Sequence, residues 1–124
     1  MKVLALDYGS ARTGVAVSDP TGTVARPLAT IDRVGDPAGF GRLLALIDAE
    51  APEQIVVGLP LTLRGEHGAQ AQETDRFVDA LREATDVPIE SYDERFTSTL
   101  ADGDDARAAA HLLSSYLEWR TARG

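Results

Sequence analysis

The amino-acid sequence predicts an α/β fold built on a five-stranded mixed sheet. Three short apolar runs joined by tight turns open the chain, a pattern typical of antiparallel strands. After them, stretches with helical spacing of apolar residues alternate with two further strand-like runs. Because a strand–helix–strand unit needs a crossover and makes parallel neighbours, we expect a mixed sheet with helices on both faces.

The antiparallel part is predicted from runs of small, apolar and β-branched residues. The first run ends in Asp7 and is followed at once by a turn over residues 8–10. Pro20 and Gly22 favour a turn between the second and third runs. The three strands are predicted over residues 3–7, 13–19 and 23–30.

The rest of the chain alternates helices with strands. Apolar residues recur at i, i+3, i+4 and i+7 in the first helix, at Phe40, Leu43, Leu44 and Ile47. The other elements are a strand over 54–58, a loop over 59–68, a helix over 69–85, a strand over 88–92 and a helix from Asp104. The last helix is expected to bury Ala109, Leu112, Leu113, Tyr116 and Leu117.

Length and composition favour one acidic globular domain, residues 1–124, in the cytoplasm. A hydrophobic fraction of 44% is too high for a disordered chain. The absence of cysteine excludes disulfides and thiolate chemistry, and no stretch resembles a signal peptide or a membrane span. The net charge of −8 argues against a basic nucleic-acid-binding face.

Carboxylates fall where strands end and where the last helix begins. Asp7 closes the first strand, Asp93 and Glu94 close the fifth, and Asp104 and Asp105 open the helix. Each one alone is adequately explained as a turn residue, a helix cap or a solvated side chain. Together at the crevice beyond the strand ends they would repel one another unless cations lay between them. The set therefore predicts a site for Mg²⁺ or Mn²⁺, with two ions activating a water and stabilising the leaving oxygen of a phosphodiester.

Four blocks cover nearly the whole chain in a fixed order. They are DYGSARTGVA at 7–16, VGLPL at 57–61, DERFTS at 93–98, and DARAA through SYL at 105–117. Together they resemble the YqgF/RuvX family of bacterial RNase H-like nucleases. The resemblance implies an RNase H-like fold with sheet order 3-2-1-4-5. It also implies a metal-dependent endonuclease that matures the 5′ end of the 16S ribosomal RNA precursor, in ribosome biogenesis, or that resolves Holliday junctions.

The same resemblance assigns the site residues. Asp7, Glu94 and Asp105 would hold the metal ions, with Asp93 as a substitute or helper. Arg12 and Arg95 flank the acidic positions, and two roles have equal weight for them. They would bind a substrate phosphate, or they would form salt bridges to Asp7, Asp93 or Glu94.

Further polar residues are candidates for substrate contact. Thr97 and Ser98 offer hydroxyls to a phosphate, although capping the next segment is an equally good explanation. Arg64 and His67 lie in the central loop, where they can touch nucleic acid or be solvated. Trp119 would stack on a base or, as we prefer, pack at the end of its helix.

The chain departs from the family in two places. Thr62 and Arg64 stand in the central loop where relatives carry Asn and Asp. Residues 101–105 pass almost directly from the acidic motif to the last aspartate, where the family has a helical, basic stretch. Either a substrate-binding element has been lost, or a mobile loop is missing from the sequence, and we favour the second explanation.

Three classes of function remain open. The first is a nuclease acting on structured RNA or branched DNA, with ribosomal precursor particles as a partner and a monomer or homodimer as its state. The second is an ATPase of the actin and sugar-kinase type, but those proteins need two such domains. The third is a catalytically silent binding module. Bound metal ions would offset some of the −8 charge, but the chain has no broad basic face, so any affinity for nucleic acid should be modest and metal-dependent.

Overall fold

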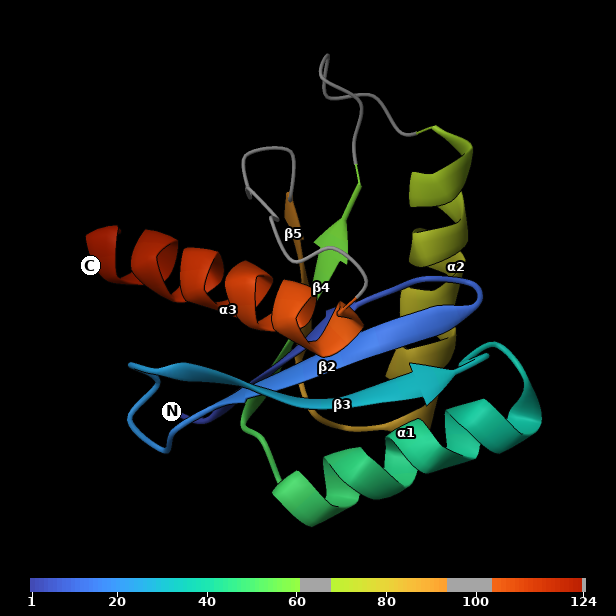
Figure 1. Ribbon diagram of the computed structural model, residues 1–124, viewed down its shortest axis with the longest axis horizontal. Helices are drawn as coiled ribbons and strands as arrows, with labels where there is room; N and C mark the ends of the chain where they lie inside the picture. The colour runs from blue at the N-terminus through green and yellow to red at the C-terminus, as the bar shows by residue number, and fades with distance from the viewer. Residues whose placement is uncertain (61–67, 94–103, 124) are drawn as a thin grey trace.

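The structure, a computed structural model, describes residues 1–60, 68–93 and 104–123. The strands are β1 (Val3–Asp7), β2 (Arg12–Ser18), β3 (Ala25–Asp32), β4 (Gln54–Leu59) and β5 (Ile89–Asp93). The helices are α1 (Pro37–Glu50), α2 (Ala69–Ala84) and α3 (Asp105–Ala122) (Figure 1).

The five strands form one sheet in the order β3-β2-β1-β4-β5. β1 pairs antiparallel with β2, and β2 antiparallel with β3. β4 lies parallel to β1, and β5 parallel to β4, because a helix connects each of these later strands to the preceding one. The predicted mixed sheet, its strand order and its antiparallel opening are therefore confirmed.

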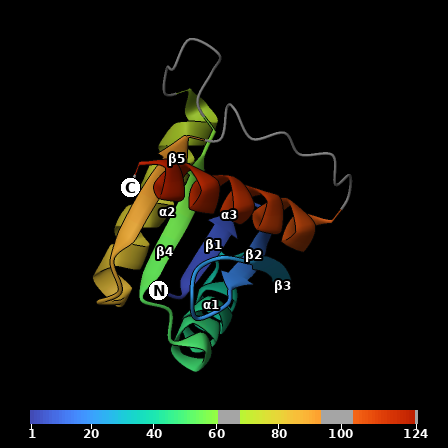
Figure 2. The same ribbon diagram turned by 90° about the vertical axis from the view of Figure 1, so that its left-hand side faces the viewer.

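Helices cover both faces of the sheet, which places two separate cores in the molecule (Figures 1 and 2). On one face α3 packs against β1, β2 and β4, and its buried residues are the five that the sequence predicted. On the other face α1 and α2 pack together over the sheet, contributing Leu43, Ile47, Phe77, Val78 and Leu81. β1 and β4 are thus buried on both faces, which explains their continuous apolar runs.

The connection between β2 and β3 differs from the prediction, because β3 starts at Ala25 and not at residue 23. The side chain of Asp19 accepts hydrogen bonds from the backbone N–H groups of Thr23 and Val24, both at 2.8 Å. The hydroxyl of Thr21 also donates to this carboxylate. These bonds hold residues 19–24 in a closed turn, so the strand cannot begin until the turn ends.

The helix ends agree with the sequence to within a residue. The carboxylate of Asp104 accepts a hydrogen bond from the backbone N–H of Arg107 at 3.1 Å, which confirms Asp104 as the N-cap of α3. Thr85, expected to be the last residue of α2, has an extended backbone and caps that helix. In the part of the chain that the structure describes, no helix combines the length and the apolar character needed to cross a membrane.

Candidate active site

Asp7 lies at the carboxyl end of β1, on the face that α3 covers. Side chains alternate along a strand, and Val3 and Ala5 both pack against α3, so Asp7 shares their side of the sheet. Burial raises the pKa of the Asp7 carboxyl above its ordinary value, and the negative charge of Asp105 raises it further. Asp7 is therefore a partly buried carboxylate with a second carboxylate close enough to oppose its ionisation.

Asp105 is brought to Asp7 by the first turn of α3. It is the first residue of the helix, directly after the Asp104 cap. Negative charge is favourable at this end of a helix, because the free N–H groups and the helix dipole stabilise it. The helix start thus supplies a site where a second acid can be kept close to Asp7.

Gly14 allows that approach. In the antiparallel register Gly14 lies opposite Asp7, on the neighbouring strand β2. A Cβ atom built on Gly14 would lie 1.8 Å from the backbone carbonyl oxygen of Asp105, a distance that no side chain can occupy. The absence of a side chain at Gly14 therefore makes room for the start of α3.

Arg12 pairs with Asp105, a partner that the sequence did not suggest. Its Nε donates to Oδ2 of Asp105 at 2.9 Å, and its side chain is 60% exposed. This contact uses one of the five N–H donors of the guanidinium. The salt-bridge role and the phosphate-binding role weighed for Arg12 are therefore compatible with one another.

A tight turn sets the position of Arg12. The hydroxyl of Thr13 donates to the carbonyl oxygen of Gly9 at 3.2 Å, which closes the connection between β1 and β2. A Cβ on Gly9 would lie 2.4 Å from the carbonyl oxygen of Arg12, so the turn requires glycine there. The turn places the acid that ends β1 and the cation that begins β2 at the same edge of the sheet.

Asp93 also lies at this edge of the sheet, but its side chain is directed away from α3. It ends β5 opposite Leu59 of β4, so one strand separates it from β1. Its neighbour Tyr92 packs against Tyr116 and Trp119 of α3, so strand alternation directs Asp93 away from that helix. Asp93 is thus not brought beside Asp7 and Asp105 on the α3 face.

The other predicted site residues lie outside the described residues. They are Arg64 and His67 in the central loop, and Glu94, Arg95, Thr97 and Ser98 after β5. The short passage at 101–103, on which the question of a missing loop depends, lies outside them as well. Within the described part of the chain, no three acidic or histidine side chains are grouped closely enough to hold a metal ion.

The chemistry of the described pair nevertheless suits a divalent cation. Asp7 and Asp105 are carboxylates, the ligands that Mg²⁺ and Mn²⁺ prefer, and they sit at a crevice-facing edge of the sheet. Burial is the larger cause of the raised pKa of Asp7, and a cation between the two carboxylates would offset the repulsion from Asp105 that adds to it. The pair by itself supplies only part of a metal site.

Two aromatic residues have roles that the sequence left unassigned or open. Tyr8, treated in the sequence as a turn residue, stacks on Phe77 of α2 with ring centroids 4.6 Å apart. The sequence feature that could have indicated a role for Tyr8 was its position directly after the aspartate that ends the first strand. Trp119 is 38% exposed, packs against Tyr92 and Tyr116, and lies under the guanidinium of Arg123, in agreement with the packing role we preferred.

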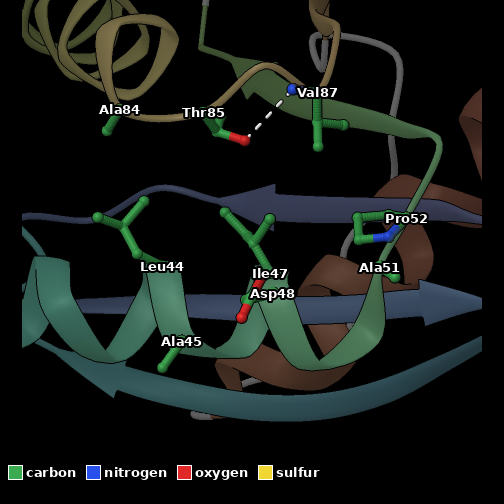
Figure 3. Close-up of a pocket in the computed structure, with 9 residues that line it drawn as sticks. All are labelled: Leu44, Ala45, Ile47, Asp48, Ala51, Pro52, Ala84, Thr85 and Val87. Carbon is green, nitrogen blue, oxygen red and sulfur yellow. Dashed lines mark hydrogen bonds between the residues drawn. The ribbon is translucent and has the colours of Figure 1, made fainter.

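A hollow of about 570 Å³ lies at the opposite edge of the sheet, between α1 and the segment that follows α2 (Figure 3). Its walls include Leu44, Ile47, Pro52 and Val87. Among the described residues that line it, Asp48 is the only acid or base. This hollow is near the amino ends of β4 and β5, and reaction sites in such sheets lie at the carboxyl ends. It is therefore not the candidate active site.

Comparison with known proteins identifies relatives over nearly the whole chain. Residues 1–119 match the family model RuvX, described as a Holliday junction resolvase. A protein of Chloroflexus aurantiacus, named "Putative pre-16S rRNA nuclease", is 43% identical over 100 residues, which are 81% of this chain and 65% of that protein. The chain thus spans less than two thirds of the length of that relative.

Relatives with the same name extend the match. The Roseiflexus protein is 46% identical over 101 residues, covering 82% of this chain and 72% of the relative. The Sulfurihydrogenibium protein is 40% identical over 132 aligned positions, covering 94% of this chain and 90% of the relative. Since 132 positions exceed the 124 residues of this chain, that relative has residues with no counterpart here.

Solved structures agree on the fold. Thermus thermophilus RuvC superposes with a TM-score of 0.61 at 17% identity, covering 98% of this chain and 97% of the other. The same protein in complex with a Holliday junction substrate gives a TM-score of 0.63, also at 17% identity, with 98% and 96% covered. RuvC has an RNase H-like fold, so the fold that the sequence resemblance implied is confirmed.

Proposed function

We propose, from the premise that this chain belongs to the RuvX family, that it is a metal-dependent endonuclease that hydrolyses phosphodiester bonds. The supporting observation is the pair formed by Asp7 and Asp105, two carboxylates from distant parts of the sequence that meet at the carboxyl edge of the sheet. Nucleases are hydrolases. The two carboxylates at this edge would supply oxygen ligands to a metal ion that also contacts a substrate phosphate.

Asp7, Asp105 and Glu94 would hold Mg²⁺ or Mn²⁺, and we propose two ions. The bound metal would supply a nucleophilic water and would stabilise the charge on the leaving oxygen. We prefer Glu94 to Asp93 as the third ligand, because the alternation of β5 turns Asp93 away from α3. Asp93 keeps the role of a helper at the same edge.

The residues of the chain itself would bind and orient the substrate. Arg12, held by Asp105 through Nε, would direct its remaining N–H groups towards a phosphate oxygen. We propose four further residues as phosphate contacts: Arg64, Arg95, Thr97 and Ser98. The partial burial of Asp7 would strengthen the electrostatic contacts that its carboxylate makes.

The proposed substrate is the 16S ribosomal RNA precursor, cut in the maturation of its 5′ end in the cytoplasm, in contact with ribosomal precursor particles. The names of the relatives support this substrate. A Holliday junction is the second candidate, supported by the family description and by the likeness to RuvC bound to such a junction. Cutting a junction would favour a homodimer, whereas trimming a precursor needs only a monomer.

The test is a side-by-side cleavage assay on precursor 16S fragments and a synthetic four-way junction, with Mg²⁺ or Mn²⁺ and with a chelator. We expect metal-dependent cleavage by the wild type and a loss of at least about a hundredfold in Asp7→Asn, because a metal ligand is removed. Asp48→Asn, an exposed acid at the other edge of the sheet, is the matched control. If the purified protein binds nucleic acid but cuts neither substrate, the chain is a binding module and the proposal fails.

A further inference from the structure

A second hollow, of about 260 Å³, lies close to Asp7 on the face of the sheet that α1 and α2 cover. The aromatic and charged side chains that line it are those of Tyr8, Phe40, Glu73, Arg76 and Phe77. Tyr8 is the residue directly after Asp7, so the hollow begins where β1 ends. None of these groups takes part in the proposed cleavage.

Three of the residues that line this hollow are aromatic. Tyr8 stacks on Phe77 at 4.6 Å with the rings inclined by 28°, and Phe40 meets Phe77 edge-on at 6.5 Å. Aromatic walls favour a flat aromatic ligand, which they contact over its faces and edges. The volume lies just under the range of roughly 300–1,000 Å³ for sites that hold drug-sized ligands, so a single nucleobase is a better match than a larger molecule.

The hollow has two charged side chains, the carboxylate of Glu73, which accepts hydrogen bonds, and the guanidinium of Arg76, which donates them. Tyr8 and Glu73 both line the hollow, so a phenol hydroxyl and a carboxylate border the same space. A carboxylate has about four acceptor positions, so Glu73 keeps the capacity to accept from a ligand.

Arg76 adds a charged hydrogen-bond donor to the same hollow. It is exposed, lies one turn of α2 from Glu73, and lines the same hollow as Tyr8. Within the described residues Arg76 and Glu73 form no ion pair with each other, so the hollow presents both charges side by side. A ligand that offers adjacent N–H donors and a carbonyl acceptor would satisfy both.

We propose that this hollow binds a guanine base of the nucleic-acid substrate and so determines where the chain cuts. Guanine offers two neighbouring N–H donors on its pairing edge, suited to Glu73, and the acceptors O6 and N7, suited to Arg76. Adenine and cytosine offer a single amino group, and uracil a single ring N–H, so each leaves part of the pattern unmet. This inference rests on the proposed nuclease function, because the base must belong to a strand whose phosphate lies at Asp7.

The position of the hollow fits such a strand. Successive side chains along a strand point to opposite faces of the sheet, so Asp7 faces α3 whereas Tyr8 faces α1 and α2. The candidate active site and the hollow therefore lie on opposite faces of the sheet, at the end of the same strand. A single-stranded segment that presents a phosphate to Asp7 can place a neighbouring unstacked base on the Tyr8 side. Recognition of an unpaired base is the usual way in which proteins read RNA sequence.

Binding is tested first without catalysis. Guanosine, adenosine, cytidine and uridine 5′-monophosphates are titrated into the metal-free protein, and backbone amide shifts are followed by NMR. We expect guanosine monophosphate to shift the amides around Tyr8, Gly35 and Glu73, with at least about tenfold weaker binding in Glu73→Gln. Glu83→Gln, an exposed acid on the same helix, should bind as the wild type does. Equal shifts by all four nucleotides, or no shifts at these amides, would overturn the proposal.

The second arm maps cleavage positions at nucleotide resolution. We expect wild-type cuts to fall at a fixed distance from a guanine, and Glu73→Gln to lose that preference by about tenfold or more. A variant that still prefers guanine contradicts the base site while leaving the nuclease intact. Specific guanosine binding in a protein that cuts nothing contradicts the nuclease and leaves the base site standing, so the two failures are distinguishable.

Discussion

Gly14 of β2 and Asp105 of α3 are in backbone contact, so close that a Cβ on the glycine would lie 1.8 Å from the Asp105 carbonyl oxygen. Gly14 is also the register partner of Asp7. One missing side chain therefore sets the separation of the two candidate metal ligands. Replacement of this glycine should affect both stability and activity, by moving the start of α3 away from the sheet.

We expect Gly14→Ala to lower the free energy of unfolding by about 3 kcal/mol or more, at the upper end of what overpacking costs. Chemical denaturation measures this change. Gly41→Ala is the control, because nothing beyond the backbone of α1 itself lies within 4 Å of a Cβ at this exposed position. That variant should gain about 0.5–1 kcal/mol, since alanine is the better helix former. Equal effects of the two substitutions would contradict the role given to Gly14.

Asp7→Asn should stabilise the metal-free protein at neutral pH. Burial and the charge of Asp105 raise the pKa of Asp7, so ionisation of Asp7 opposes folding. The destabilisation is absent below the unfolded pKa of 3.8 and is fully present above the raised pKa of the folded state. Thermal unfolding with a chelator should give a higher Tm for the variant at pH 7 and equal values near pH 4. A variant that is less stable at pH 7 would contradict this assignment.

Divalent metal should reverse that order. If Asp7 and Asp105 bind Mg²⁺ or Mn²⁺, the wild type gains stability from the ion, by about 2.7 kcal/mol at a concentration a hundred times Kd. Asp7→Asn and Asp105→Asn should gain much less. The measurement is Tm against metal concentration, with Asp48→Asn as a control that responds as the wild type does. Identical metal responses in all four proteins would exclude this site.

Arg12→Gln should weaken nucleic-acid binding with little effect on folding. The ion pair with Asp105 is largely exposed, and such pairs contribute about 0–1 kcal/mol. Loss of one phosphate contact should lower the slope of log affinity against log salt by about one unit. Binding titrations at several salt concentrations measure the slope. An unchanged slope with a large loss of stability would show that Arg12 is structural.

Asp19→Ala should destabilise the turn between β2 and β3 without affecting cleavage. Hydrogen bonds from the Thr21 hydroxyl and from the backbone of Val24 and Thr23 hold the pKa of Asp19 well below its ordinary value. Their contribution is complete above the unfolded pKa of 3.8 and is lost as the pH falls towards the lowered pKa of the folded state. The deficit in Tm should be clear at pH 7 and should shrink in acid. A loss of cleavage would contradict the remote position of this turn.

Much of the fold could be predicted because local patterns encode it. The continuous apolar run before Asp7, the glycines and proline in the turns, and the helical spacing around Leu43 each specify an element within a few residues. The start of β3 was missed by two residues, because the side chain of Asp19 extends the turn by bonds that hydrophobic pattern does not register.

The sequence by itself determined that acids stand at the strand ends and at the start of the last helix, since both places are defined by local chemistry. Only the tertiary structure decided which of them meet. Asp105 reaches Asp7 and Arg12 because α3 crosses the sheet at Gly14, and Asp93 is turned away by the alternation of β5. Contacts between distant parts of the chain depend on the packing of whole elements against one another, and local periodicity carries no record of that packing.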